Sequence, residues 1–160
     1  MSCTRLIDYI VIRDSREKLN YGWDFQQSHP NKKPPKCLGT EISTLKTGDY
    51  TIKDYEDILT IERKDSFVEL WNNYSYRARF ESEVLRMSQY KYAYILIESC
   101  LTPETLGLSP PQFKTGVPGK ALIRWLIGLS LKYGVHIVPV GRCGKEFAQF
   151  IFEEVIKAEK

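Results

Sequence analysis

The sequence predicts an α/β fold in which helices cover both faces of a β-sheet. Short stretches rich in Ile, Val and Tyr alternate along the chain with segments of helical periodicity, which is typical of such a sheet. The 160 residues match one domain of ordinary size, so we expect residues 1–160 to form a single domain. Hydrophobic residues make up 42% and charged residues 27%, a balance that excludes a disordered, collagen-like or coiled-coil chain.

The first half of the chain predicts three strands. Residues 5–13 form an apolar run that ends at Asp14. Two further strand signals, near residues 50–53 and over residues 58–64, flank an acidic turn and so predict a hairpin. Between the first strand and the hairpin, residues 22–40 are rich in Pro, Gly, Asn and Ser, which predicts a long, mobile loop.

A helix is predicted to begin just after the hairpin. Ser66 is a good N-cap and Glu69 follows three residues later, which is the capping-box pattern. The pair Asn72-Asn73 and the nearby Ser75 weaken the helical periodicity, so we expect the helix to be interrupted there.

The remaining elements alternate between strands and helices. In chain order they are a strand over 92–98, a Pro/Gly-rich loop over 102–119, a helix over 120–133 closed by Gly134, a strand over 135–140 and a helix over 145–158. His136 lies in an apolar strand and is expected to be a core histidine. The last helix is expected to bury one stripe, made of Phe147, Phe150, Ile151, Glu154, Val155 and Ala158.

Composition and motifs exclude several classes of function. The longest apolar run, residues 121–131, is far shorter than the about 20 residues of a membrane span, so no membrane partner is expected. The chain has no signal-peptide pattern and only four scattered cysteines, which predicts an intracellular, reduced protein and no zinc site. The Gly116–Lys120 stretch has the wrong spacing for a P-loop, and Ala121 replaces the magnesium-binding hydroxyl, so no nucleotide cofactor is expected.

Acidic residues stand at the ends of the predicted strands. Asp14 and Glu17 close the first strand, Asp49 opens the hairpin, and Glu62 and Lys64 lie near its end. Side chains two residues apart on a strand share a face, so Glu62 and Lys64 project together and Arg63 points the other way. Carboxylates suit Mg²⁺, so this set is suited to metal-dependent phosphodiester hydrolysis. The alternative is a solvated strand face with ordinary ion pairs.

Three short motifs in order resemble a known family. Asp14-Ser-Arg16-Glu17, Gly48-Asp49-Tyr50 and Glu62-Arg63-Lys64 resemble the nuclease domain of the XPF/Mus endonucleases, and Glu69-Leu70 and Leu96-Ile97-Glu98 continue the likeness. The resemblance implies a restriction-endonuclease-like core, with a mixed central sheet flanked by helices, that uses Mg²⁺ or Mn²⁺. It implies a metal-dependent endonuclease acting on branched, flap or fork DNA. A Holliday-junction resolvase, a restriction-like nuclease and a catalytically inactive DNA-binding module are the alternatives.

The resemblance also implies roles for individual residues. Asp49 and Glu62 would bind the metal ion, Asp14 and Glu17 would complete the acidic site, and Lys64 would be the catalytic lysine. Arg63, counted with the catalytic set, would be tied to the substrate or to the site geometry, and Arg16 would approach a phosphate. We expect no helix–hairpin–helix domain, which most members of the family carry, because the last predicted helix leaves no room for one.

DNA is therefore expected to be held by basic residues of this domain. The candidates are Lys32, Lys33 and Lys36 in the first long loop, together with Arg77, Arg79 and Arg86 in and after the interrupted helix. For the lysine loop, a merely solubilising role is the alternative. The helix over 120–133 is apolar nearly all round, and the family dimerises through its nuclease domains, so a homodimer is expected.

Overall fold

The computed structural model describes residues 7–17, 22–107 and 119–160, and it contains one six-stranded mixed sheet among them. The strand order is β2-β1-β3-β4-β5-β6. The strands are β1 (Tyr9–Asp14), β2 (Cys37–Ser43), β3 (Tyr50–Ile52), β4 (Leu59–Lys64), β5 (Tyr92–Ile97) and β6 (His136–Pro139). β3 runs antiparallel to β1 and β4, whereas the β1–β2, β4–β5 and β5–β6 pairs are parallel.

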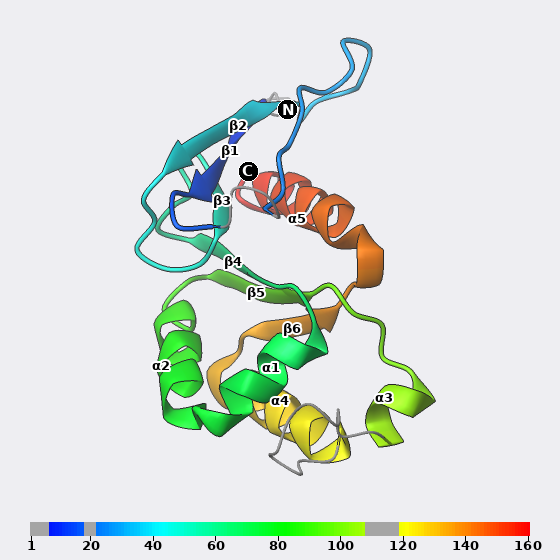
Figure 1. The fold of residues 1–160 in the computed structure, drawn as a ribbon. Helices are drawn as coiled ribbons and strands as arrows, with labels where there is room; N and C mark the ends of the chain where they lie inside the picture. Colours follow the sequence, from blue (N-terminus) through cyan, green and yellow to red (C-terminus); the bar gives the residue numbers. More distant parts are fainter. Residues whose placement is uncertain (1–6, 18–21, 108–118) are drawn as a thin grey trace.

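Helices cover both faces of this sheet (Figure 1). They are α1 (Phe67–Ser75), α2 (Arg77–Met87), α3 (Pro103–Gly107), α4 (Gly119–Tyr133) and α5 (Gly144–Ala158), with the short 3-10 helix η1 (Gly141–Cys143) before α5. α5 packs on one face, whereas α1, α2 and α4 pack on the other (Figure 1). None of the described helices is long and apolar enough to cross a membrane.

Two apolar clusters fix the helices to the sheet. Side chains of β1, β3 and β4, such as Val11 and Ile61, pack against Phe152 of α5. On the opposite face, Ile95 of β5 packs with Phe80 of α2 and residues of α1 and α4. The charged residues of β4 therefore lie on a strand whose two faces are each covered by helices.

The predicted hairpin and the interrupted helix are confirmed. β3 and β4 pair in an antiparallel register through Tyr50 and Ile61. Ser66 caps α1 by accepting a hydrogen bond from the Glu69 amide, at 3.4 Å, and α1 gives way to α2 at Tyr76. The left-handed Gly134 follows α4 as predicted, with a φ of 68°.

The prediction of a mobile loop over residues 22–40 is wrong in two places. β2 begins within it, at Cys37, because pairing along β1 satisfies a stretch whose own sequence shows no clear alternation. Trp23 and Phe25 are buried in the core beside Tyr50, since burial of two large aromatic rings holds this segment against the sheet. Only the part between Phe25 and Cys37 runs outside the core without regular structure.

Two further predictions are wrong, and a third falls partly on residues that the structure does not describe. His136 is exposed rather than buried, because β6 is the edge strand, and its ring stacks on Tyr94 at 4.8 Å. α5 buries a stripe rotated from the predicted one, made of Ala148, Ile151, Phe152, Val155 and Ile156, and Phe150 stays exposed. The predicted loop over 102–119 contains α3, and its residues 108–118 lie outside the described residues.

Candidate active site

The two faces of β4 carry different charged residues, as its alternation predicts. Glu62 and Lys64 project toward α1 and α2, and the Lys64 Nζ donates a hydrogen bond to Glu62 Oε1 at 2.8 Å. Arg63 projects to the other face, where its side chain lies over the Trp23 ring. One strand therefore supplies both a polar pair on one side and a separate buried cation on the other.

The turn before β3 carries Asp49 to β4. The Asp49 amide donates to the Ile61 carbonyl at 2.8 Å, and Asp49 Oδ2 accepts from the Arg63 amide at 2.8 Å. Gly48 makes this approach possible, because its φ is +78° and a Cβ there would lie 2.2 Å from Thr60 Oγ1. The Asp49 carboxylate thus binds the backbone of the residue between Glu62 and Lys64.

Asp49 lies in an environment that disfavours its charge. Burial is the main reason that its pKa is raised from 3.8 to about 7, and the charges of Glu17 and Glu83 act in the same direction. The hydrogen bond from the Arg63 amide and the charge of Lys64 act in the opposite direction without cancelling the effect. The Asp49 charge is therefore poorly compensated where it stands.

The pKa values of Glu62 and Lys64 are both raised, for different reasons. Burial raises the pKa of Glu62 well above its ordinary value, and the charges of Asp49 and Glu83 raise it further. Burial alone would lower the pKa of Lys64, but the nearby Glu62 and Glu83 outweigh it and the pKa is raised. Lys64 is therefore held as an ammonium group among carboxylates.

A polar cavity of about 440 Å³ opens beside these residues, between β4, α1 and α2. It is lined by Glu62, Lys64, Glu69, Asn73, Tyr76, Arg79, Phe80, Glu83 and Arg86. Lys64 Nζ lies 3.8 Å from Glu69 Oε1 and 3.6 Å from Glu83 Oε1, so three carboxylates surround it. A substrate group entering this cavity would meet the Glu62–Lys64 pair directly.

A buried network supports the opposite face of β4. Arg63 Nε and Nη2 donate to Glu98 Oε2 at 2.9 and 2.5 Å, and Trp23 Nε1 donates to Glu98 Oε1 at 2.8 Å. Glu17 Oε1 lies 3.7 Å from Arg63 Nη1, which places Glu17 behind the site and close enough to influence Asp49. Arg63 was expected to be tied either to the substrate or to the site geometry. Its side chain lies in this supporting network.

Asp14 and Arg16 are engaged with the backbone at the edge of the site. The Asp14 carboxylate accepts hydrogen bonds from the Arg16 amide and guanidinium and from the Leu45 amide, at 2.7–3.0 Å. Burial alone would raise the pKa of Asp14, but these hydrogen bonds outweigh it and lower the pKa. The pair ties the end of β1 to the segment leading into Asp49.

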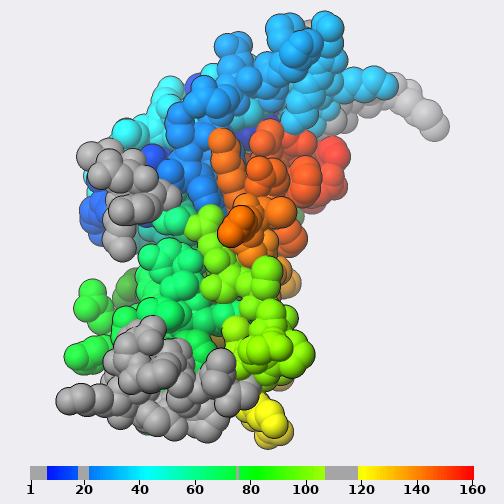
Figure 2. Space-filling view, turned by 45° about the vertical axis from the view of Figure 1, so that its right-hand side comes forward, coloured from blue at the N-terminus to red at the C-terminus, as the bar shows by residue number. Residues whose placement is uncertain are grey.

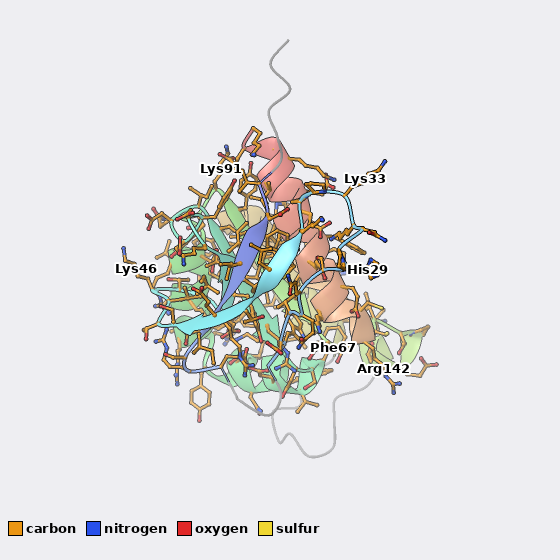
Figure 3. All side chains as sticks on the ribbon, turned by 90° about the horizontal axis from the view of Figure 1, so that it is seen from above. His29, Lys33, Lys46, Phe67, Lys91 and Arg142 are labelled. Atoms are coloured by element: carbon orange, nitrogen blue, oxygen red, sulfur yellow. The ribbon has the colours of Figure 1, made fainter. Side chains whose placement is uncertain are left out.

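The three loop lysines lie away from the cavity. Residues 22–36 run beside α5 at one end of the molecule, whereas residues 60–106 occupy the other end (Figure 2). Lys32 pairs with Glu153 of α5, and Lys36 Nζ donates to the Pro30 carbonyl at 2.6 Å. Lys33 projects from the tip of this segment, away from Phe67 at the start of α1 (Figure 3).

The predicted helix arginines all lie in α2 but differ in their contacts. Arg77 stacks on the Tyr74 ring, with its guanidinium carbon 4.8 Å from the ring centroid. Arg79 lines the cavity beside Lys64. Arg86 lines it as well, so the structure brings Arg79 and Arg86, but not Arg77, to the candidate site.

The donor set fits a hard divalent cation that keeps water ligands. Asp49 and Glu62 offer carboxylate oxygens, and a cation between them would neutralise the charge that their raised pKa values reflect. Within the ranges that the structure describes, no cluster of three or more His, Cys, Asp or Glu side chains is arranged to hold a metal ion. A bound ion would thus take two protein carboxylates and complete its shell with water or phosphate oxygens.

The model of the ERCC4 domain matches residues 13–153. The chain belongs to the ERCC4 domain family. The match spans all three motifs that predicted the resemblance to the XPF/Mus nuclease domain, and that resemblance is confirmed. Comparison with curated proteins found no match.

Solved structures confirm the fold of this ERCC4 domain. "XPF from Aeropyrum pernix" is 17% identical with a TM-score of 0.57, and the match covers 94% of this chain and 61% of that one. "XPF from Aeropyrum pernix, complex with DNA" is 16% identical with a TM-score of 0.60, covering 95% of this chain and 66% of that one. The ERCC4 domain therefore has the restriction-endonuclease-like α/β fold and spans less than two thirds of either chain.

The roles of two important residues of the ERCC4 domain escaped the sequence analysis. Glu83 of α2 reaches Lys64, and its spacing from Arg79 by one helical turn was the available signal. Glu98 follows β5 directly and was identified in the sequence as the end of an apolar strand that continues the family likeness, but without a partner, although an acid after a buried strand points to a buried partner.

Proposed function

We propose that this ERCC4 domain is a DNA endonuclease that hydrolyses phosphodiester bonds with Mg²⁺ or Mn²⁺, acting on branched, flap or fork DNA. The observation that carries the proposal is the Glu62–Lys64 pair at a polar cavity, with the Asp49 carboxylate bound to the backbone of the residue between them. The complex of an XPF with DNA, which shares this fold, supports DNA as the substrate.

Asp49 and Glu62 would hold the cation, which when bound supplies positive charge to the phosphate and lowers the pKa of a water molecule. Lys64 keeps its proton, because the surrounding carboxylates raise its pKa. It therefore orients water or phosphate and balances the charge that develops on the phosphate oxygens, and it does not act as a base. Arg63 and Glu98 hold β4 in place behind this set.

The direct test is cleavage of defined DNA substrates. Flap, fork and Holliday-junction DNA are incubated with the protein in Mg²⁺, in Mn²⁺ and in chelator. We expect cleavage of flap or fork DNA only with the metal ion, and its loss in Asp49→Asn and Lys64→Met. Lys46→Met is the matched control, since Lys46 is an exposed lysine outside the polar cavity.

The other outcomes separate the alternatives. Preferred cleavage of the Holliday junction would indicate a resolvase. Cleavage of unbranched duplex would indicate a restriction-like nuclease. Binding without cleavage in either metal ion would indicate a catalytically inactive DNA-binding module.

We also propose that the domain forms a homodimer through the apolar surface of α4. Ile127 and Leu131 are exposed there, and they border a groove of about 240 Å³ that continues to the edge strand β6. Exposed apolar surface of this kind is typical of an interface. A dimer mass in solution at micromolar concentration that becomes monomeric in Leu131→Glu is expected, and a monomeric wild-type mass would contradict the proposal.

A further inference from the structure

The polar cavity has an acidic wall and a basic wall. Glu62, Glu69 and Glu83 all lie within 4 Å of Lys64, and so this lysine is shared among three carboxylates. Arg79 and Arg86 line the same cavity. The two walls therefore differ in charge although they enclose one space.

Helix α2 carries side chains of both walls along one side. Arg79, Glu83 and Arg86 are spaced by four and then three residues, which places them on one side of the helix. The two arginines are about 10.5 Å apart along the helix axis, at 1.5 Å per residue. They can thus flank a single elongated group that also reaches Lys64.

Neither of these two arginines is neutralised by the protein. Among the described residues, no carboxylate pairs with Arg79 or Arg86, and both side chains are exposed to the cavity and solvent. Arg63 and Arg16, in contrast, are each held by an acidic partner. Two unpaired guanidinium groups beside a reactive pair are suited to an anion, and a phosphodiester matches their geometry well.

A neutral donor in the same cavity points to the same ligand. The Nδ2 atom of Asn73 is buried, and within the described chain it has no hydrogen-bond partner. Asn73 belongs to α1 and lies in the cavity lining with Arg79 and Arg86. A buried amide donor without a partner is costly, and a turn of the Asn73 side chain toward the cavity would let a phosphate oxygen satisfy it.

We propose that Arg79, Arg86 and Asn73 form a phosphate subsite of this cavity, which holds the backbone phosphate adjoining the bond that is cut. The proposal rests on the proposed function, because it assigns the second phosphate that a DNA strand brings to the same cavity. The subsite positions the strand so that the neighbouring phosphate meets Glu62 and Lys64. Arg86 is the decisive residue, because nothing in the described chain gives it another role.

The test is a scan in which single DNA phosphates are made neutral. The strand of fork DNA that the wild type cuts in Mg²⁺ is prepared with one methylphosphonate at each position in turn, and binding is measured in chelator. We expect wild-type affinity to fall about tenfold at a phosphate adjoining the cut, the loss of one charge-assisted contact. We expect Arg86→Gln to bind unmodified DNA more weakly than the wild type does. Neutralising that same phosphate should not reduce its affinity further.

Arg142→Gln is the matched control, since Arg142 is an exposed arginine in η1 beside α5 and outside the cavity (Figure 3). Its affinity should fall at the same phosphates, and by the same factors, as that of the wild type. Asn73→Ala should lose sensitivity at the same phosphate as Arg86→Gln, by a smaller factor. The slope of log affinity against log salt should fall by about 0.7–0.9 in Arg86→Gln and stay unchanged in Arg142→Gln.

Two failures have different meanings. If the wild type binds and cuts DNA but Arg86→Gln keeps wild-type sensitivity at every phosphate, the subsite is overturned and the nuclease stands. If the wild type binds no DNA, the subsite and the proposed function are overturned together.

Discussion

The two faces of β4 use charge in opposite ways. Toward α5, Arg63 is matched by Glu98 and Glu17, and its guanidinium lies over the Trp23 ring, so its charge is satisfied within the protein. On the other side, the pKa values of the half-buried Glu62 and Asp49 are raised, and the buried Lys64 is shared among several carboxylates. The first arrangement stabilises the fold, and the second lowers stability to hold charge ready for a ligand.

The largest loss of stability is expected on the Arg63 face of β4, where the charges are paired within the protein. Glu98→Ala leaves Arg63 without its main partner and Trp23 Nε1 without an acceptor. The free energy of unfolding should fall by roughly 3 kcal/mol, the lower end for a buried pair because Glu98 keeps some solvent contact. Urea unfolding measures this, with Glu81→Ala as the control. Glu81 pairs with Lys132 on the surface and should cost less than about 1 kcal/mol. Equal losses in the two variants would remove the distinction between the faces.

A smaller loss is expected at the turn that carries Asp49. Gly48→Ala places a Cβ 2.2 Å from Thr60 Oγ1 at a φ of +78°, so the turn must shift away from β4. The strain should cost roughly 1–3 kcal/mol in urea unfolding and should reduce cleavage further by displacing Asp49. Gly128→Ala in α4 is the control. A Cβ at Gly128 meets nothing within 4 Å, and helix propensity favours this change. A Gly48→Ala protein with wild-type stability would refute this explanation of the turn.

The unsatisfied face should respond to charge removal with the opposite sign. Between about pH 4 and pH 7 the folded state binds the Asp49 proton more tightly than the unfolded chain does, because the pKa is raised from 3.8 to about 7. Stability from this group is therefore present at low pH and is lost as the pH rises through this window. In chelator at pH 8, Asp49→Asn should be more stable than the wild type, because the amide has no charge to bury.

The control for this comparison is Asp57→Asn, because Asp57 is almost fully exposed. Thermal unfolding across pH 4–8 should give parallel curves for Asp57→Asn and the wild type, and a flatter curve for Asp49→Asn. A destabilised Asp49→Asn at pH 8 would mean that the Asp49 charge is already well compensated within the protein.

The smallest effect is expected from the metal ion alone. Mg²⁺ at about ten times its dissociation constant should stabilise the wild type by about 1.4 kcal/mol. Asp49→Asn and Glu62→Gln should show little of this gain, since each loses a carboxylate oxygen of the proposed pair. Thermal unfolding with and without Mg²⁺ measures the gain, and an equal gain in both variants would place the ion elsewhere.

Local pattern predicted the parts of this molecule that depend on local geometry. The period of two along β4 separated Glu62 and Lys64 from Arg63, and the Ser66 cap located the start of α1. The edge strand β2 was missed because its residues gain their structure from β1. Glu83 and Glu98 were not assigned these roles because their partners, Lys64 and Arg63, lie on other elements, and a local pattern can indicate a partner without identifying it.

Comparing Glu62→Gln with Glu98→Gln tests the central claim most directly, by single-turnover cleavage of fork DNA in Mg²⁺ together with the unfolding free energy of each protein. The account predicts that Glu62→Gln loses roughly a thousandfold in cleavage rate without losing stability. It predicts that Glu98→Gln loses stability and keeps a rate within roughly tenfold of the wild type when folded. Cleavage at the wild-type rate by a folded Glu62→Gln would contradict the assignment of this cavity as the active site.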